Sequence, residues 1–352
     1  MAVILGKNQE EKPYKLLDMA LLDIFDSADW KSKDGDKSEK AVAKINDQQK
    51  LARIATEAPH FMARKAAVVK LDSQNHQELF ANIAKYDINR HVCVAAANKL
   101  TDQRLLADVV KKAKDNQVRR VILNNLDKQH QELFAQIAKN DDDKSVRIIA
   151  TDKLFDQMML ADLAKTAKDT DIRQAAIEKM NEWHQILYIE IAKDFRANDS
   201  LREAAVRKLT NQDLILELAK NEKYGLRHVA LDKLDRLQYQ SLFSYIAKND
   251  SNKHVRQSAV KKLTDQTLLA DIAKNDKSAD VRLVAIENLN EQYQELFADV
   301  AINDTSASVR SIAIQKLNRQ SQQTLLSYIA ENDQEDWVRK IANEKLSAKT
   351  KV

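Results

Sequence analysis

The chain consists of short segments in which apolar residues recur three and four positions apart, separated by short polar stretches. One kind of segment begins with Val-Arg. In segment 281–289, Val281, Val284, Ala285 and Leu289 fall on one face of a helix. A second kind is of the type Asp-Gln-x-Leu-Leu-Ala-Asp-x-Ala-Lys, as in 102–111 and 265–274. The spacing predicts two kinds of amphipathic helix, which we call helix A (the Asp-Gln type) and helix B (the Val-Arg type).

The pattern Val-Arg-x-x-Ala-Val-x-Lys-Leu recurs along the chain at steps of 25–29 residues. The position of its Arg holds Arg in ten of twelve copies, and Ser38 and Cys93 are the exceptions. Neither helix can bury its apolar face alone, so neighbouring copies must stack into one continuous core. The sequence therefore predicts an all-α fold, an α-solenoid of about twelve two-helix repeats. The twelve positions are 38, 64, 93, 119, 147, 173, 202, 227, 256, 282, 310 and 339.

An Asp precedes several of these Arg residues by six positions, as Asp141 precedes Arg147 and Asp304 precedes Arg310. Short helical pairs with this Asp, and with Val-Arg opening the second helix, resemble HEAT repeats of the short bacterial kind. The resemblance covers residues 37–346. It implies that helix B lines a concave face, and it is specific for architecture, because many unrelated functions use this scaffold.

Short and long loops alternate between the repeats, which gives a superperiod of 54–55 residues and suggests duplication of a two-repeat module. Residues 1–36 do not fit the repeat, so we expect them to form an N-terminal helical cap, with a helix over about 13–26. The expected organisation is a cap and loop over 1–36, the HEAT-like solenoid over 37–346 and a C-terminal tail over 347–352.

Composition supports the all-α interpretation. Three glycines and two prolines are too few for a fold rich in hairpins, whereas 44% hydrophobic and 31% charged residues suit amphipathic helices. The net charge of +4 is smaller than a dedicated nucleic-acid binder usually carries. A single cysteine excludes an intramolecular disulfide, and the N-terminal apolar run is too short for a signal peptide. We expect a cytoplasmic protein without a membrane span.

Two rows of basic residues have a structural and a functional interpretation. The Arg row needs acidic partners, because it lies in the first turn of helix B; inter-repeat ion pairs with the preceding Asp are favoured over a phosphate-binding row. A Lys row in the last turn of helix B suits the negative end of that helix, and the alternative is a basic stripe that follows an anionic polymer. The Lys row comprises Lys44, Lys70, Lys99, Lys153, Lys179, Lys208, Lys233, Lys262, Lys316 and Lys345.

No catalytic or metal site is predicted, and no cofactor. A row of His and Tyr precedes every second helix A, but His76 and His130 are separated by two repeats, on the order of 20 Å, which is too far for one metal ion. The HEAT-like metalloenzyme deoxyhypusine hydroxylase uses His-Glu pairs, whereas Gln follows both of these histidines. HEAT-like alkylpurine DNA glycosylases gather aromatic residues in one basic cleft, and here the three tryptophans are dispersed.

The positions that the repeat does not fix should carry the binding function. We expect the residues one and five positions after the Arg to point outward from helix B, toward the concave face that the resemblance implies. They mix both signs of charge with apolar residues, which suits a protein or peptide partner better than a phosphate backbone. The candidate partner-binding residues are Lys65, Val94, Arg120, Ile148, Gln174, Arg207, His228, Gln257, Lys261 and Leu283.

The leading hypothesis is therefore a non-enzymatic protein-binding scaffold that uses the helix B face. Nucleic-acid binding along the Lys row is one alternative. An accessory subunit of an enzyme, as among HEAT-like phycobilisome lyases, is another and rests on the fold alone. Self-association through the end repeats is also compatible with the sequence, because a solenoid exposes apolar faces at its ends unless they are capped.

Overall fold

The computed structural model describes residues 28–221 and 225–347. Over these residues it contains 23 α-helices, one short 3-10 helix and no strand, which confirms the all-α prediction. The helix predicted over 13–26, most of the predicted N-terminal cap and all but the first residue of the predicted C-terminal tail lie outside the described residues. No helix among the described residues is long and apolar enough to cross a membrane.

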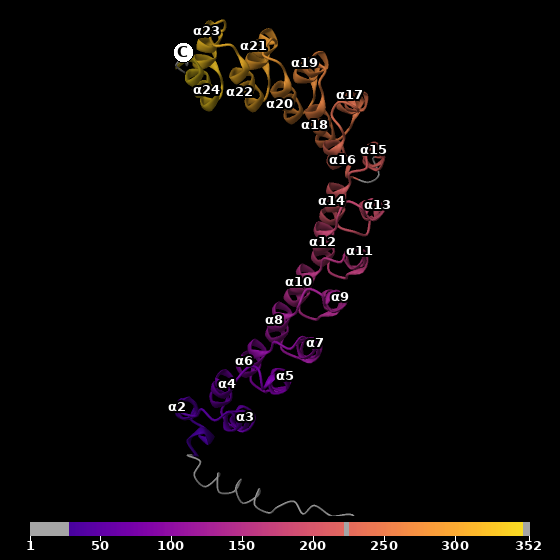
Figure 1. Cartoon of the computed structure of the whole chain (residues 1–352). Coiled ribbons are helices and arrows are strands. Elements are labelled where there is room, and N and C mark those ends of the chain that lie inside the picture. Colours follow the sequence, from indigo (N-terminus) through magenta and orange to yellow (C-terminus); the bar gives the residue numbers. More distant parts are fainter. Residues whose placement is uncertain (1–27, 222–224, 348–352) are drawn as a thin grey trace, which may run out of the picture. The chain divides into compact units, whose positions relative to one another are not determined.

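The chain forms two compact units, 1–159 and 160–352, and the boundary falls inside helix α11 (Gln157–Thr166). The described part of the first unit begins with the 3-10 helix η1 (Ala28–Lys31) and α2 (Gly35–Ala43). Helices A and B then alternate along the chain (Figure 1). They are α3 (Gln48–Glu57), α4 (Phe61–Lys70), α5 (Gln77–Tyr86), α6 (Arg90–Lys99), α7 (Gln103–Lys112), α8 (Asn116–Asn125), α9 (Gln131–Asn140) and α10 (Lys144–Lys153).

The second unit continues the same alternation, with odd-numbered helices of type A and even-numbered helices of type B. After α11 it contains α12 (Thr170–Lys179), α13 (Gln185–Lys193), α14 (Asp199–Lys208), α15 (Gln212–Lys220) and α16 (Arg227–Lys233). It ends with α17 (Gln240–Asn249), α18 (Lys253–Lys262), α19 (Gln266–Asn275), α20 (Ala279–Asn288), α21 (Gln294–Asn303), α22 (Ala307–Lys316), α23 (Gln323–Asn332) and α24 (Asp336–Ser347).

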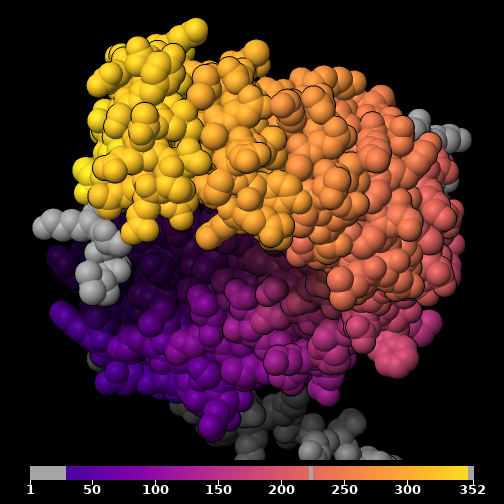
Figure 2. All heavy atoms as spheres, turned by 90° about the horizontal axis from the view of Figure 1, so that it is seen from above, coloured from indigo at the N-terminus to yellow at the C-terminus, as the bar shows by residue number. Residues whose placement is uncertain are grey.

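Each unit has two layers, one of A helices and one of B helices (Figure 1). Every A helix except α11 packs closely against the B helix that follows it. The predicted apolar face of helix B is buried: Val281 and Ala285 are fully enclosed, and Val284 and Leu289 nearly so. The orange-to-yellow repeats of the second unit lie directly side by side at the surface (Figure 2). The predicted solenoid of helical pairs is confirmed for both units.

Successive B helices contact one another more closely than successive A helices in both units. A layer whose members approach more closely must lie on the inner side of a curved stack. In the second unit, α18, α20, α22 and α24 lie inside the bend that α17, α19, α21 and α23 cover (Figure 1). The B layer therefore provides the inner surface of each unit.

The superperiod of 54–55 residues is also visible in the buried side chains of the A helices. From α3 to α21, the fourth residue of helix A alternates between an aliphatic side chain after a short loop and an aromatic one after a long loop. Helix α23 departs from this pattern, because it follows a long loop and carries Leu326. The aromatic members are fully buried, so the bulkier core side chains occur in the repeats with longer loops. The aromatic members are Phe80, Phe134, Tyr188, Phe243 and Phe297, and aliphatic members include Leu51, Leu106 and Leu269.

Candidate binding surface

The Arg row forms ion pairs between repeats. Arg282 donates from Nε and Nη2 to the two carboxylate oxygens of Asp304 in the next repeat, both at 2.7 Å, and from Nη1 to the carbonyl oxygen of Asp276 at 2.8 Å. Each such Arg thus joins the loop of its own repeat to the carboxylate of the following repeat. The pairs are Arg64–Asp87, Arg119–Asp141, Arg227–Asp250, Arg256–Asp276, Arg282–Asp304 and Arg310–Asp333.

These contacts confirm the ion-pair interpretation of the Arg row and show that the partner lies across the repeat boundary. The pKa of Arg282 lies above its ordinary value, because its hydrogen bonds to the Asp304 carboxylate outweigh the effect of burial. Both side chains of the pair are about nine-tenths buried, at 10% and 6% exposure. The paired guanidinium groups are therefore not available to bind phosphate.

At the two positions where the Arg row lacks Arg, the next repeat also lacks the Asp that would pair with it. Cys93 replaces Arg, and Ala113 stands where the next repeat would supply the Asp; Ser38 and Ala58 show the same double replacement. The Cys93 thiol lies 3.2 Å from the carbonyl oxygen of Asp87, and burial raises the pKa of the thiol to about 11. Where the cation is absent the carboxylate is absent too, so neither repeat buries an unpaired charge.

The Lys row caps helices. Lys316 donates from Nζ to the carbonyl oxygens of Glu287 and Leu289, at the C-terminal end of the preceding B helix, at 2.8 and 3.3 Å. This favours the structural interpretation, because the ammonium groups satisfy carbonyls that a helix end leaves without partners. Burial also lowers the pKa of Lys233 and Lys345. The same contact to the preceding repeat is made by Lys70, Lys99, Lys153, Lys208, Lys233, Lys262 and Lys345.

A third row, of glutamines, was not assigned a role from the sequence. Gln240, the first residue of α17, accepts from the amide of Thr264 at 2.9 Å and donates to the carbonyl oxygen of Lys262 at 2.8 Å, both in the next repeat. Gln is the first residue of all eleven A helices in the described part of the chain, and that regularity was the available signal. The row comprises Gln48, Gln77, Gln103, Gln131, Gln157, Gln185, Gln212, Gln240, Gln266, Gln294 and Gln323.

The His and Tyr row occupies the N-cap positions of five A helices that follow long loops, and none of its side chains caps a helix amide. Nδ1 of His76 lies 3.0 Å from the carbonyl oxygen of Asp72, within its own loop. His76 therefore takes part in the packing of its own loop. Among the described residues, no group of three or more His, Cys, Asp or Glu side chains is placed to hold a metal ion.

The residues that remain for binding lie on the inner surface of the B layer. The position five residues after the Arg is exposed in every repeat from α4 to α24, as predicted. The position one residue after the Arg is mostly half-buried, because the neighbouring B helices pack close to it. Val94 and Leu283 are therefore less exposed than expected, and Ser311, at the same position, is buried; Ile148 is exposed at 45%.

A second group of residues on this surface was missed. The position two residues before the Arg precedes the other two positions by three and seven residues, so all three form one stripe along helix B. His91 and Gln117 occupy it in α6 and α8, and both are exposed. The i, i+3, i+7 spacing of the three positions was the signal in the sequence. We call the stripe formed by these three positions the inner stripe.

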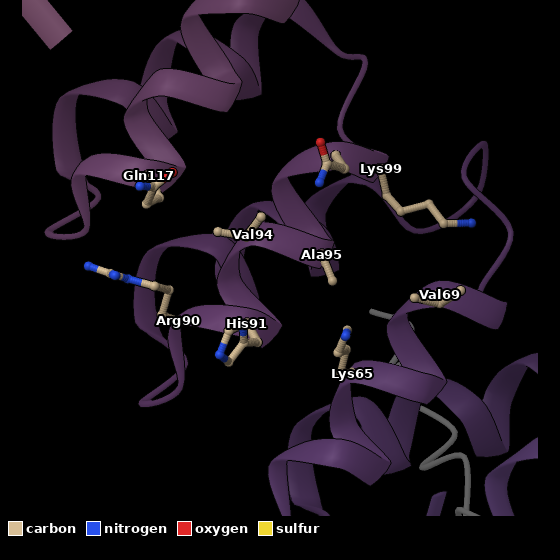
Figure 3. A pocket seen from close by; sticks show the side chains of 9 residues that line it. Lys65, Val69, Arg90, His91, Val94, Ala95, Lys99 and Gln117 are labelled. Carbon is tan, nitrogen blue, oxygen red and sulfur yellow. The ribbon is translucent and has the colours of Figure 1, made fainter. Parts of the chain in front are cut away.

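Two of the ten predicted binding residues line one cavity. In the first unit, Lys65 and Val94 line a hollow of about 590 Å³ between α4, α6 and α8. Figure 3 shows Lys65 and Val69 extending from α4, His91, Val94 and Ala95 from α6, and Gln117 from α8. Arg120 and Ile148 follow on α8 and α10 but do not line this hollow. The other predicted residues are distributed over α12–α20 of the second unit: Gln174, Arg207, His228, Gln257, Lys261 and Leu283.

The charge of the inner stripe differs between the two units. In the first unit the stripe carries the cations Lys65 and Arg120, and its one acidic side chain from α4 to α10 is Asp152. In the second unit acidic residues predominate, with Arg207, Lys261 and Lys340 as basic exceptions. Arg207 pairs with Glu203 at 3.2 Å. The acidic residues of the second unit's stripe are Asp171, Glu178, Glu203, Asp232, Asp280, Glu287 and Glu344.

No family model matches this chain, and a search of the curated proteins finds no match to it.

Proposed function

We propose that this chain is a non-enzymatic scaffold of the HEAT type that binds a protein partner along the inner stripe of its B helices. The observation that carries the proposal is that some side chains of helix B hold the repeats together, whereas others are exposed. The Arg and Lys rows are engaged in contacts between repeats, whereas the residues five positions after each Arg are exposed and differ from repeat to repeat. Variable exposed residues on a rigid inner surface suit the recognition of one particular partner.

The composition of the stripe supports a protein rather than a nucleic acid. Phosphate backbones are bound by repeated, accessible Lys and Arg side chains. Here eight lysines of the Lys row donate to backbone carbonyls, and the exposed stripe position of the second unit is mainly acidic. Apolar side chains such as Ile148, 45% exposed, offer contacts that a protein partner buries.

The test is affinity capture from the lysate of the native source, with and without nuclease, using matched charge reversals. Two variants alter the inner stripe, Lys65→Glu/Arg120→Glu in the first unit and Arg207→Glu/Lys261→Glu in the second. Their controls change the same charge on the A helices and loops, at exposed residues: Lys111→Glu/Lys114→Glu and Lys220→Glu/Lys248→Glu.

We expect a discrete protein that survives nuclease, is captured by both controls and is lost from at least one stripe variant. Capture that disappears with nuclease would instead favour nucleic-acid binding. A partner that all four variants retain would place the binding surface outside the stripe. Recovery of the chain itself as the only captured protein would indicate self-association.

A further inference from the structure

The hollow between α4, α6 and α8 has an apolar floor, and the charged residues that line it are all basic. Val69, Val94 and Ala95 contribute the apolar surface, and Val69 is 53% exposed. None of the nine residues that line the hollow is acidic, whereas three of them are Lys or Arg. The hollow lies on the inner stripe of the first unit, which is the surface proposed above for partner binding.

The cations around the hollow differ in availability. Lys99 donates to the carbonyl oxygen of Leu71 at 3.2 Å, and Arg90 binds Asp115 at 2.7 Å. Lys65 is exposed, and among the described residues its ammonium group forms no ion pair. His91 is exposed beside it, and the amide side chains of Asn98 and Gln117 add hydrogen-bond donors. Lys65 is therefore the cation that a ligand can bind without first breaking a contact within the chain.

We propose that this hollow binds a segment of a partner protein in which an aliphatic side chain is flanked by Asp or Glu. The aliphatic side chain would pack on Val69, Val94 and Ala95, and a flanking carboxylate would pair with Lys65. The inference rests on the proposed function and specifies the class of partner. Charge complementarity selects the acidic residues, and the apolar floor selects the aliphatic anchor.

A nucleic acid fits this hollow less well than an acidic peptide. Single-stranded bases bind by stacking on Phe, Tyr or Trp, and none of the nine lining residues is one of these. The floor of aliphatic side chains has no counterpart in a phosphate backbone. The observations therefore favour a peptide, and an oligonucleotide serves as the competing ligand in the test.

The experiment is a selection of random 12-residue peptides displayed on phage, using the purified full-length chain as bait. We expect the selected peptides to contain an aliphatic residue flanked by Asp or Glu. A synthetic consensus peptide should bind the unaltered chain and the control Lys111→Glu equally well. Its affinity should fall about tenfold with Lys65→Glu, which replaces an attraction by a repulsion, and should fall at increased salt.

One further variant and one altered peptide keep the test independent of folding. Val69→Asp alters an exposed side chain, so it should weaken binding without disturbing the core, even if Val94→Asp unfolds the repeat. A peptide in which Lys replaces the acidic residues should bind Lys65→Glu better than it binds the unaltered chain. This reversal is not expected of a variant that is merely destabilised.

The outcomes separate the two proposals. Peptides without acidic residues, or binding that neither Lys65→Glu nor Val69→Asp affects, would overturn the assignment of the hollow and leave the scaffold function standing. If no peptide is selected and a fluorescent single-stranded oligonucleotide binds in a salt-dependent manner, both proposals are contradicted. If neither ligand binds, the assignment of the hollow is also contradicted.

Discussion

At the scale of single residues, buried ion pairs join six of the repeats to the repeat that follows. A bidentate Arg–carboxylate pair is stable inside a protein only when both partners are present, since removing one leaves a buried charge without compensation. The chain follows this rule where the pattern changes, because Cys93 occurs with Ala113 and Ser38 occurs with Ala58. Neither of these two repeat boundaries therefore keeps a carboxylate that the missing Arg would have neutralised.

The pair Arg282–Asp304 allows a direct test of this coupling. Asp304→Ala should destabilise the contact between α20 and α22 by about 3 kcal/mol, because Arg282 loses its carboxylate partner. Combining it with Arg282→Cys reproduces the natural pair at positions 93 and 113 and should recover at least half of that loss. Native-state hydrogen exchange of α20 and α22 measures both effects locally. A double variant as unstable as the sum of the single variants would contradict the coupling.

Acid should weaken the same contacts. Burial raises the pKa of Asp333, but the hydrogen bonds from Arg310 and from the amide of Glu335 lower it by a larger amount. The pKa of Asp333 therefore lies below the ordinary value of 3.8. A carboxylate with a lowered pKa in the folded state contributes stability above the pKa of the unfolded chain, and this stability is lost as the pH falls through the folded-state pKa.

Asp333→Asn should therefore lower the melting temperature at pH 7, and the difference from the unaltered chain should shrink as the pH falls below about 4. Thermal unfolding followed by circular dichroism at pH 7, 5, 4 and 3 measures this difference in melting temperature. Asp336→Asn is the control in the same repeat, because its side chain is 92% exposed and should have little effect. A difference that stays constant down to pH 3 would exclude the proposed role of the Asp333 carboxylate.

At the scale of helices, the Gln row fixes how each A helix is placed against the following repeat. One amide side chain both accepts from a loop amide and donates to the carbonyl at the end of the neighbouring B helix. An amide group is suited to this double role, because it carries a donor and an acceptor side by side. The row therefore ties the loops of successive repeats together on the side opposite to the buried ion pairs of the A–B loops.

Gln240→Ala should lower local stability by about 1 kcal/mol, because the amide of Thr264 loses its acceptor and the carbonyl of Lys262 keeps only its hydrogen bond from Arg236. The amide of Thr264 should exchange faster with solvent, as hydrogen exchange will show. Gln240→Glu keeps the acceptor but replaces the donor by a charge next to a carbonyl, so it should restore only part of the protection. Gln238→Ala, an exposed position in the same loop, is the control. Equal effects of Gln240→Ala and Gln238→Ala would contradict the role of the row.

The helices and their order could be predicted from the sequence, because apolar spacing and the recurrence of Val-Arg report directly on packing. The geometry of the contacts could not. The sequence places an Asp six residues before its Arg, but the pair forms with the Arg of the preceding repeat, and only stacking determines that choice. Exposure was also only partly predictable: Val94 and Leu283 lie on the expected side of their helices, yet neighbouring B helices cover much of each.

At the scale of the molecule, the strength of the contacts between repeats varies along the chain. Within the second unit, Arg196 and Asn221 stand where later repeats carry the Asp of the ion pair. Arg202 pairs instead with Asp199, which is 82% exposed and so worth less. Helix α16 has only seven residues and no side-chain N-cap hydrogen bond. In a solenoid, stability is close to a sum of contacts between neighbours, so these repeats should be the weakest of the unit.

Hydrogen exchange over the intact chain should therefore show faster opening of α14 and α16 than of α18, α20 and α22. Asn221→Asp should slow the exchange of α14, because it supplies a carboxylate at the position where Asp250 and Asp276 pair with Arg. Asn249→Asp, at an exposed position outside the row, is the control. Uniform protection across the unit would mean that the ion pairs do not set the stability of the repeats.

The central claim is that the inner stripe of the B helices is the partner-binding surface, and site-specific photo-cross-linking tests it most directly. A photoreactive amino acid would replace Val69, Asn98 or Glu287 on the stripe, and Lys111 or Lys248 on the A helices, in the chain expressed in its native source. All five positions are exposed, so the substitutions should leave the core intact. The account predicts one protein adduct, formed from at least one stripe position and from neither position on the A helices. Adducts that form only from the A helices, or that consist of nucleic acid, would contradict it.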